Sequence, residues 1–265
     1  MGIWRKTSIR KFIDVPIQPG PINRRLRHDR RALIAAIILT WGLLGIMVGA
    51  AQAEDAEDKL GNWLGFNSTV RFSDHWSLFG QGEVRFWEVA SDLNETLFRI
   101  AGHYDINKIA MAGIGYVRVD TWPYDNDNES GRERIENRLY QQFAMKQGWA
   151  RARFEHRFRL EQRWFPKNEG DGYSNRGRYR LQVTVPLTHA AIQPGAYFIN
   201  TFNETFINFD GGERDFDQNR LYFGGGHQFT SAANLQLGLL WQARSSTDFF
   251  RLQFYYTHNF DLRNR

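Results

Sequence analysis

Residues 149–165 constrain the fold of this chain more than any other stretch, because their side chains alternate in character over seventeen positions. Successive side chains leave a β-strand on opposite sides, so a period of two predicts a strand. Strands of soluble proteins average about five or six residues, whereas a tilted strand that crosses a bilayer needs about nine to eleven. One face is largely apolar, with Ala150, Ala152, Phe154, His156, Phe158, Leu160, Gln162 and Trp164. The other face is charged throughout, with Arg151, Arg153, Glu155, Arg157, Arg159, Glu161 and Arg163.

Residues 1–53 have the parts of a secretory leader. A basic segment ends at Arg30-Arg31, an apolar run covers 32–50, and Ala51-Gln52-Ala53 supplies a small-x-small cleavage site. A retained membrane anchor is the alternative, because the run is long enough to span a bilayer. The leader holds nine Lys and Arg, which leaves 25 basic and 27 acidic residues in 54–265, a net charge of −2. The basic character therefore belongs to the leader and does not indicate a nucleic-acid partner.

The rest of the chain, 54–265, reads as a single domain of alternating runs without helical periodicity. There is no cysteine, so neither a disulfide framework nor a thiolate metal site is available. Short connections near 73–75, 107–108, 147–148, 188–191 and 230–233 alternate with longer ones at 88–94, 121–133, 166–175, 207–218 and 245–248. Tight turns at one end and longer loops at the other are typical of an outer-membrane barrel. The runs cover 62–72, 76–87, 95–106, 109–120, 134–146, 149–165, 176–187, 192–206, 219–229, 234–244 and 249–262.

A soluble barrel is apolar inside and a membrane barrel is polar inside, so alternation alone does not separate them. The tryptophans favour the membrane, since those after residue 53 all lie near the ends of runs, where interfacial girdles are found. The final run also has an apolar face, with Phe250, Leu252 and Phe254. We therefore expect an all-β, antiparallel, up-and-down transmembrane barrel in the outer membrane, with the arginines of 149–165 inside and Phe154, Phe158 and Leu160 toward lipid.

Four stretches resemble an uncharacterised family of Gram-negative outer-membrane proteins, domain of unknown function 2490. They are NWLGFNSTVRFSDHWSLFGQGEVRF, ENRLYQQF, RFRLEQRWF and DQNRLYFGGGHQF, and the resemblance covers nearly all of 61–265. It implies an outer-membrane barrel and brings no activity or catalytic residue with it. Eleven runs are visible, but bacterial single-chain barrels have even strand numbers. We therefore expect twelve strands, with ten as the alternative.

The faces predicted to point inward carry fourteen arginines against six acidic residues, with Arg118 and Asp120 among them. Positive charge is densest on 134–187, where the predicted lumen residues are Arg138, Arg151, Arg153, Glu155, Arg157, Arg159, Glu161, Arg163, Arg176, Arg178 and Arg180. Rings of basic side chains favour anions in pores. This predicts a narrow anion-preferring pore or a solute-binding barrel. The alternative is a structural, envelope-maintenance barrel whose lumen is plugged by its own side chains.

A lipid hydrolase is the least favoured function, since it rests on the single His-x-Ser pair His75 and Ser77, which we expect at a tight turn. The acidic loop 124–129 lacks the glycine and distal glutamate of a calcium loop, and we interpret both it and 210–217 as solvated acidic loops, so we expect no metal site. No cofactor or nucleic-acid partner is expected. The expected partners are outer-membrane lipid and lipopolysaccharide, the export and barrel-assembly machinery, and a small anionic solute.

Overall fold

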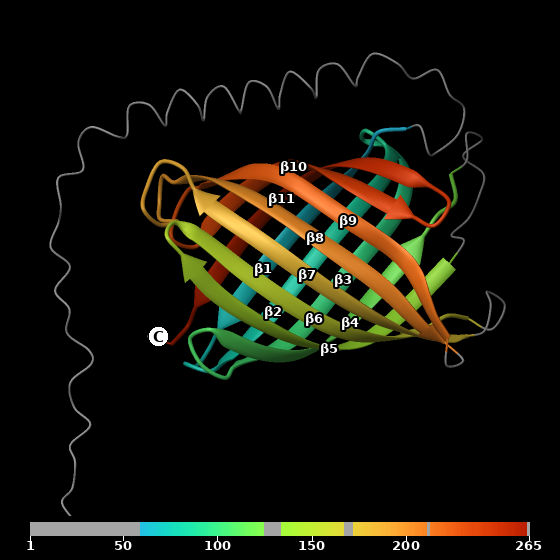
Figure 1. Cartoon of the computed structure of the whole chain (residues 1–265), viewed down its shortest axis with the longest axis horizontal. Coiled ribbons are helices and arrows are strands. Elements are labelled where there is room, and N and C mark those ends of the chain that lie inside the picture. The colour runs from blue at the N-terminus through green and yellow to red at the C-terminus, as the bar shows by residue number, and fades with distance from the viewer. Residues whose placement is uncertain (1–58, 125–133, 167–171, 211–212, 264–265) are drawn as a thin grey trace, which may run out of the picture. The chain divides into compact units, whose positions relative to one another are not determined.

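The computed structural model describes residues 59–124, 134–166, 172–210 and 213–263, which form eleven β-strands (Figure 1). The strands are β1 (Gly61–Arg71), β2 (Trp76–Glu88), β3 (Ser91–Asp105), β4 (Ala110–Thr121), β5 (Arg134–Trp149), β6 (Ala152–Trp164), β7 (Tyr173–Pro186), β8 (Tyr197–Asp210), β9 (Glu213–Gln228), β10 (Ala233–Arg244) and β11 (Asp248–Asp261). Each alternating run of the sequence corresponds to one of them. No helix within the described ranges is long and apolar enough to cross a membrane.

The strands close into a barrel in which every sequential pair is antiparallel. Because the strand number is odd, β1 and β11 run in the same direction, and they close the barrel as a parallel pair from Gly61↔Arg251 to Arg71↔Asp261. This closure leaves no unpaired strand edge. The expectation of twelve or ten strands is therefore not confirmed, since the described residues close with eleven.

The two ends of the barrel are named here by the strands that begin or end there. At the N-terminal end, where β1 begins, strands are joined by 89–90, 122–133, 165–172, 211–212 and 245–247. At the C-terminal end, where β11 ends, they are joined by 72–75, 106–109, 150–151, 187–196 and 229–232. The predicted separation into a tight end and a loose end holds only in part. The 89–90 turn is short and 187–196 is longer than expected.

The β2–β3 hairpin shows why the loop lengths were misjudged. Its turn is formed by Val89 and Ala90, and Ala90 adopts a positive φ of 58°. Positive φ is uncommon outside glycine, and neither residue is a usual turn former. A β-bulge at Arg85/Phe86 adjusts the register beside the turn. The hairpin is therefore tight without the sequence signals that would have predicted it.

Exposure alternates along the strands as a polar lumen requires. On β6, Phe158 and Leu160 are 47% and 57% exposed, whereas Arg159 and Glu161 are 4% and 1% exposed. The strands thus point their charged face inward and their apolar face outward. Strand β4 departs from the prediction. Val117 and Val119 are buried, while Arg118 lies opposite the exposed Phe98 on the outer face.

The mistaken direction of Arg118 and Asp120 has a simple cause. Both faces of β4 carry apolar residues, with Ile114 and Tyr116 on the face opposite the two valines, so polarity alone does not orient this strand. The guanidinium of Arg118 donates two hydrogen bonds of 3.0 Å to Asp120 on the outer face. The lumen therefore holds fewer charges from this strand than the sequence predicted.

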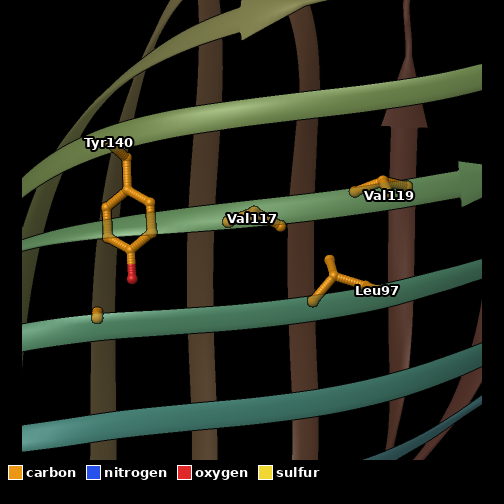
Figure 2. Packing of buried hydrophobic residues seen from close by; sticks show 5 residues of the cluster. Leu97, Val117, Val119 and Tyr140 are labelled. Carbon is orange, nitrogen blue, oxygen red and sulfur yellow. The ribbon is translucent and has the colours of Figure 1, made fainter.

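A small apolar cluster lines the inner wall on β3, β4 and β5. Figure 2 shows Leu97, Val117, Val119 and Tyr140 coming from these three neighbouring strands. The Tyr140 ring lies over Gly115, where a Cβ would meet its Cζ and Oη atoms at 2.6 Å. Glycine at 115 thus lets the tyrosine lie flat along the wall, and its ring reaches from β5 toward β3.

Candidate functional site

The lumen contains a cavity of about 610 Å³ that extends toward the C-terminal end. Met111 and Asn234, the second residues of β4 and β10, line it close to that end. Among the described residues its lining holds seven arginines but three glutamates, so it carries an excess of positive charge. The arginines are Arg85, Arg99, Arg157, Arg159, Arg178, Arg180 and Arg220, and the glutamates are Glu83, Glu155 and Glu204.

The structure divides the predicted lumen residues into three groups. Glu155, Arg157, Arg159, Arg178 and Arg180 line the cavity. Arg138, Glu161, Arg163 and Arg176 lie in the lumen nearer the N-terminal end, outside the lining of the cavity. The last group differs from expectation: Arg151 lies in the 150–151 turn, and both Arg151 and Arg153 are exposed. The turn lies three residues later than predicted, so Trp149 ends β5 instead of opening β6.

Buried ion pairs gather in the N-terminal half of the lumen on β5, β6, β7 and β9. We call six of its residues the ion-pair layer: Glu136, Arg138, Glu161, Arg163, Arg176 and Asp217. Arg176 binds the carboxylate of Glu161 through Nε at 2.9 Å and Nη2 at 2.7 Å, and its Nη1 reaches Asp217 at 2.8 Å. Glu136 accepts from Arg138 at 2.6 and 2.8 Å and from Arg163 at 2.5 Å. Three cations and three anions thus neutralise one another.

Arginines also face one another across the β6–β7 ladder. Arg157 is paired with Arg180, and Arg159 with Arg178, in the register of the two strands. Like charges directly opposite one another on a sheet are destabilising unless they are neutralised. Glu204 on β8 receives Arg157 at 2.7 Å and Arg178 at 3.0 Å, and Arg178 also binds Glu161 at 2.6 Å. Three of the four arginines are thereby matched, with Arg180 donating to Glu155 at 3.0 Å.

Arg159 is the least neutralised of the four arginines that face one another across β6 and β7. Its Nη2 donates to the amide oxygen of Gln142 at 2.8 Å, and the nearest carboxylate oxygen, on Glu161, lies 3.8 Å from Nη1. Arg99 on β3 is held in a similar way, through a 2.7 Å bond to Gln81. The guanidinium carbons of Arg159 and Arg99 lie 4.2 and 5.8 Å from the centre of the Tyr140 ring.

Several donors of the cavity-lining residues lack a hydrogen-bond partner within the described part of the chain. They are Arg99 Nε, Arg157 Nε, Arg159 Nε and Nη1, Arg180 Nε and Tyr140 Oη, and all of these residues line the cavity. Buried donors are normally satisfied, and an unmet one costs about 1–3 kcal/mol. A group of them that is mostly cationic is suited to receive an anion.

Neutral amide side chains make up a large part of the cavity wall. The amide side chains in its lining are Asn67, Gln81, Gln142, Gln182, Asn200, Asn234, Gln236, Gln253 and Asn259. Some of them bond to each other, as Asn200 does to Gln236 at 2.9 Å and Gln236 to Asn234 at 3.1 Å. An amide side chain can both donate and accept, so this wall suits neutral polar groups of a ligand.

Sequence reasoning missed some of the lumen carboxylates. Glu95, which pairs with Arg85, lies in line with Leu97 and Arg99 on β3, and this alternation was the signal that could have found it. Asp217 was placed in an acidic loop, but it belongs to β9 and pairs with Arg176. The other acidic loop, at 124–129, lies outside the described residues from 125 onward, as does the leader.

The structure does not bring His75 and Ser77 together as a nucleophilic pair. The His75 Nδ1 atom bonds the backbone oxygen of Asp105 at 2.7 Å, and its ring stacks on Tyr104 with 5.4 Å between the centroids. Ser77 is buried on β2 at 4% exposure. The histidine is thus held by the neighbouring hairpin, and its ring is not oriented by a carboxylate as a catalytic base would need.

The chain matches a known protein family. A family model described as "Protein of unknown function (DUF2490)" matches residues 60–260. No curated protein and no solved structure matches the chain.

Proposed function

The chain belongs to this family of proteins of unknown function, and we propose that it is an outer-membrane β-barrel that binds a small anionic solute in its lumen. The single observation that carries the proposal is the charge of the cavity, which is lined by seven arginines and three glutamates. A site with this excess of guanidinium groups favours anions.

The inverted distribution of polarity supports insertion in a membrane. The outer face exposes large apolar side chains all around the barrel, including Phe98 at 56%, Ile114 at 54%, Leu160 at 57% and Phe223 at 48%. A soluble monomer rarely exposes contiguous apolar surface of this extent. The strands are 11 to 16 residues long, enough for tilted strands to cross a bilayer. Odd strand numbers do occur among membrane barrels.

Tryptophans near the strand ends agree with this placement. Trp76, Trp149, Trp164 and Trp241 are exposed on the barrel, as side chains in an interfacial girdle would be. Trp63 differs, because it is 5% exposed and its ring packs under the Arg85 guanidinium at 3.8 Å. Export would require removal of the leader 1–53, and folding would require the barrel-assembly machinery. Lipopolysaccharide and phospholipid are then the surroundings of the apolar face.

Binding in a closed lumen is favoured over conduction through it. The ion-pair layer lies on the N-terminal side of the cavity on β5, β6, β7 and β9, with Glu136 and Glu161 each 1% exposed. Such a layer alone would also suit a purely structural barrel with a plugged lumen. The cavity and its unmatched arginine donors favour a ligand-binding role, because a plug has no need of unsatisfied cations.

Two measurements test this proposal. Fractionation should place the protein in the outer membrane, where folded barrels migrate faster on gels when unheated, and recovery as a soluble periplasmic protein would contradict the membrane assignment. In planar bilayers the purified protein should give no steady conductance, and its thermal stability in detergent should rise with added small anions. Steady anion-selective channels would instead identify a pore.

A further inference from the structure

We propose that the solute is a sugar acid, a hydroxyl-rich ring bearing a carboxylate, which sits with its carboxylate between Arg99 and Arg159 and its hydroxyls against the amide wall. This inference rests on the proposed function, since it names the ligand class of the same cavity. The cavity has two features that a bare anion would not use together. One is the group of Arg99, Arg159 and Tyr140, which we call the anion seat and in which the arginines have no close carboxylate partner. The other is a long wall of neutral amides.

The anion seat is built by three strands around one ring. Arg99 from β3 and Arg159 from β6 both lie against Tyr140 from β5, and Gly115 on β4 leaves the space in which that ring lies flat. Both guanidinium groups are held by glutamine oxygens and not by close carboxylates. Neither guanidinium charge is therefore neutralised by a close carboxylate.

The ion-paired arginines Arg176 and Arg178 do not offer such a seat. Arg176 is satisfied by Glu161 and Asp217, and Arg178 by Glu161 and Glu204, in hydrogen bonds of 2.6 to 3.0 Å. An incoming anion would have to displace a buried carboxylate from them. Arg159 carries two nitrogens without a hydrogen-bond partner among the described residues, and Arg99 carries one. The geometry thus points to the Arg99–Tyr140–Arg159 group as the anion seat.

The rest of the cavity suits a polyhydroxylated body. Amides outnumber every other residue type in its lining, and they extend from Gln142 beside the anion seat to Asn234 near the C-terminal end. A hydroxyl both donates and accepts, and so does an amide, which allows a network of hydrogen bonds to a sugar ring. A site built to bond hydroxyls rejects analogues that lack them.

Two aromatic faces complete the wall. Phe79 on β2 stacks with His103 at 5.7 Å, and Phe202 on β8 stacks with Tyr222 at 5.0 Å, so both rings are held in fixed planes. Strands β2 and β8 lie on opposite sides of the closed barrel. The C–H faces of a sugar ring are apolar and can pack against such rings. The volume of about 610 Å³ is within the ~300–1,000 Å³ of small-molecule sites.

The test is calorimetric titration of the purified full-length barrel in detergent with four probes: glucuronate, glucose, acetate and inorganic phosphate. We expect glucuronate to bind at least about tenfold more tightly than acetate or phosphate, and glucose to give no measurable heat. Equal binding of acetate, or tighter binding of phosphate, would overturn the sugar-acid assignment and leave anion binding intact. Equal binding of glucose would overturn the anion seat. No binding of any anion would overturn the proposed function as well.

Two variants locate the parts of the site. Arg159→Gln should weaken glucuronate binding about tenfold or more, because it removes the charge but keeps a polar side chain. The matched control is Arg118→Gln, which removes an arginine from the outer face and should leave the affinity unchanged. Gln182→Leu, of similar volume in the amide wall, should weaken glucuronate several-fold without changing acetate. Equal loss with Arg118→Gln and Arg159→Gln, or no loss with either lumen variant, would overturn the assignment.

Discussion

The ion-pair layer and the cavity use the same residue types with opposite results. In the layer, Arg138, Arg163 and Arg176 face an equal number of carboxylates, and each is hydrogen-bonded to at least one of them. In the cavity the arginines outnumber the glutamates, and Arg99 and Arg159 are held by amides. The ratio of carboxylates to arginines, and not the number of arginines, distinguishes the ion-pair layer from the cavity.

This difference has an energetic basis. Removing a charge from water is costly, and attraction to a partner offsets that cost only if geometry and hydrogen bonding are good. The layer meets this condition through bonds such as Arg176 to Glu161 at 2.7 and 2.9 Å. The cavity does not meet it at Arg159. We therefore expect the layer to contribute to stability and the cavity to contribute to binding, and the following changes test that separation.

The largest effect is expected for Glu161→Gln. Its carboxylate is fully buried and binds both Arg176 and Arg178, so the change leaves two buried guanidinium groups with weakened partners. Breaking a buried pair on one side costs about 3–5 kcal/mol. Urea unfolding in detergent, followed by the gel shift of the folded barrel, measures the loss of unfolding free energy.

Glu155→Gln is the control for that experiment. Glu155 lies in the cavity, its side chain is 27% exposed, and its close partner is Arg180. Neutralising it should cost roughly 1 kcal/mol, since solvent screens the pair and a hydrogen-bonding amide remains. Equal losses for Glu155→Gln and Glu161→Gln would contradict the separation of the two regions.

An intermediate effect is expected for Gly115→Val, which blocks the space under Tyr140. Its Cβ alone would lie 2.6 Å from the tyrosine ring and 2.7 Å from Ala101 Cβ. Overpacking of this kind costs about 1–3 kcal/mol. Because the ring must move, glucuronate binding should weaken as well. Gly82→Val is the matched control on the outer face, where a Cβ meets nothing within 4 Å, and it should change neither stability nor affinity.

A smaller effect on stability is expected for Arg159→Met. The side chain faces Arg178 across the ladder and has no close carboxylate, so its removal relieves repulsion while it loses the bond to Gln142. The unfolding free energy should change by less than about 1 kcal/mol, in either direction. Arg178→Met should be clearly more destabilising, because it leaves Glu161 and Glu204 short of a partner. The reverse order would contradict the assignment of charge balance in the lumen.

The sequence predicted much of this arrangement, because strand alternation is a local property. The inward direction of β6 and β7 could be predicted, since one face of each strand is nearly all charged. The direction of β4 could not be predicted, because Val117 and Val119 lie on one face and Ile114 lies on the other. The predicted hairpin length was wrong at Val89–Ala90, because Ala90 adopts a positive φ without being glycine.

The charge balance of the lumen could not be predicted from the sequence, for a different reason. It depends on which strands become neighbours and in which register, as when Glu204 on β8 reaches Arg157 on β6 across β7. Counting arginines per face gave an excess without showing where it would be neutralised. The prediction of a basic lumen therefore left the anion seat at Arg99, Tyr140 and Arg159 unresolved.

The smallest effect is expected for Ser77→Ala, which extends the comparison to the C-terminal end of the barrel. Ser77 lies on β2 at 4% exposure, and His75 bonds Asp105 instead of the serine hydroxyl. Loss of a buried hydroxyl without a strong partner should change the unfolding free energy by less than about 1 kcal/mol. Glucuronate binding and the lipid composition of the envelope should match those of the wild type. An altered lipid composition with the fold intact would show that this end of the barrel carries hydrolase chemistry, and that the lumen is not its main functional region.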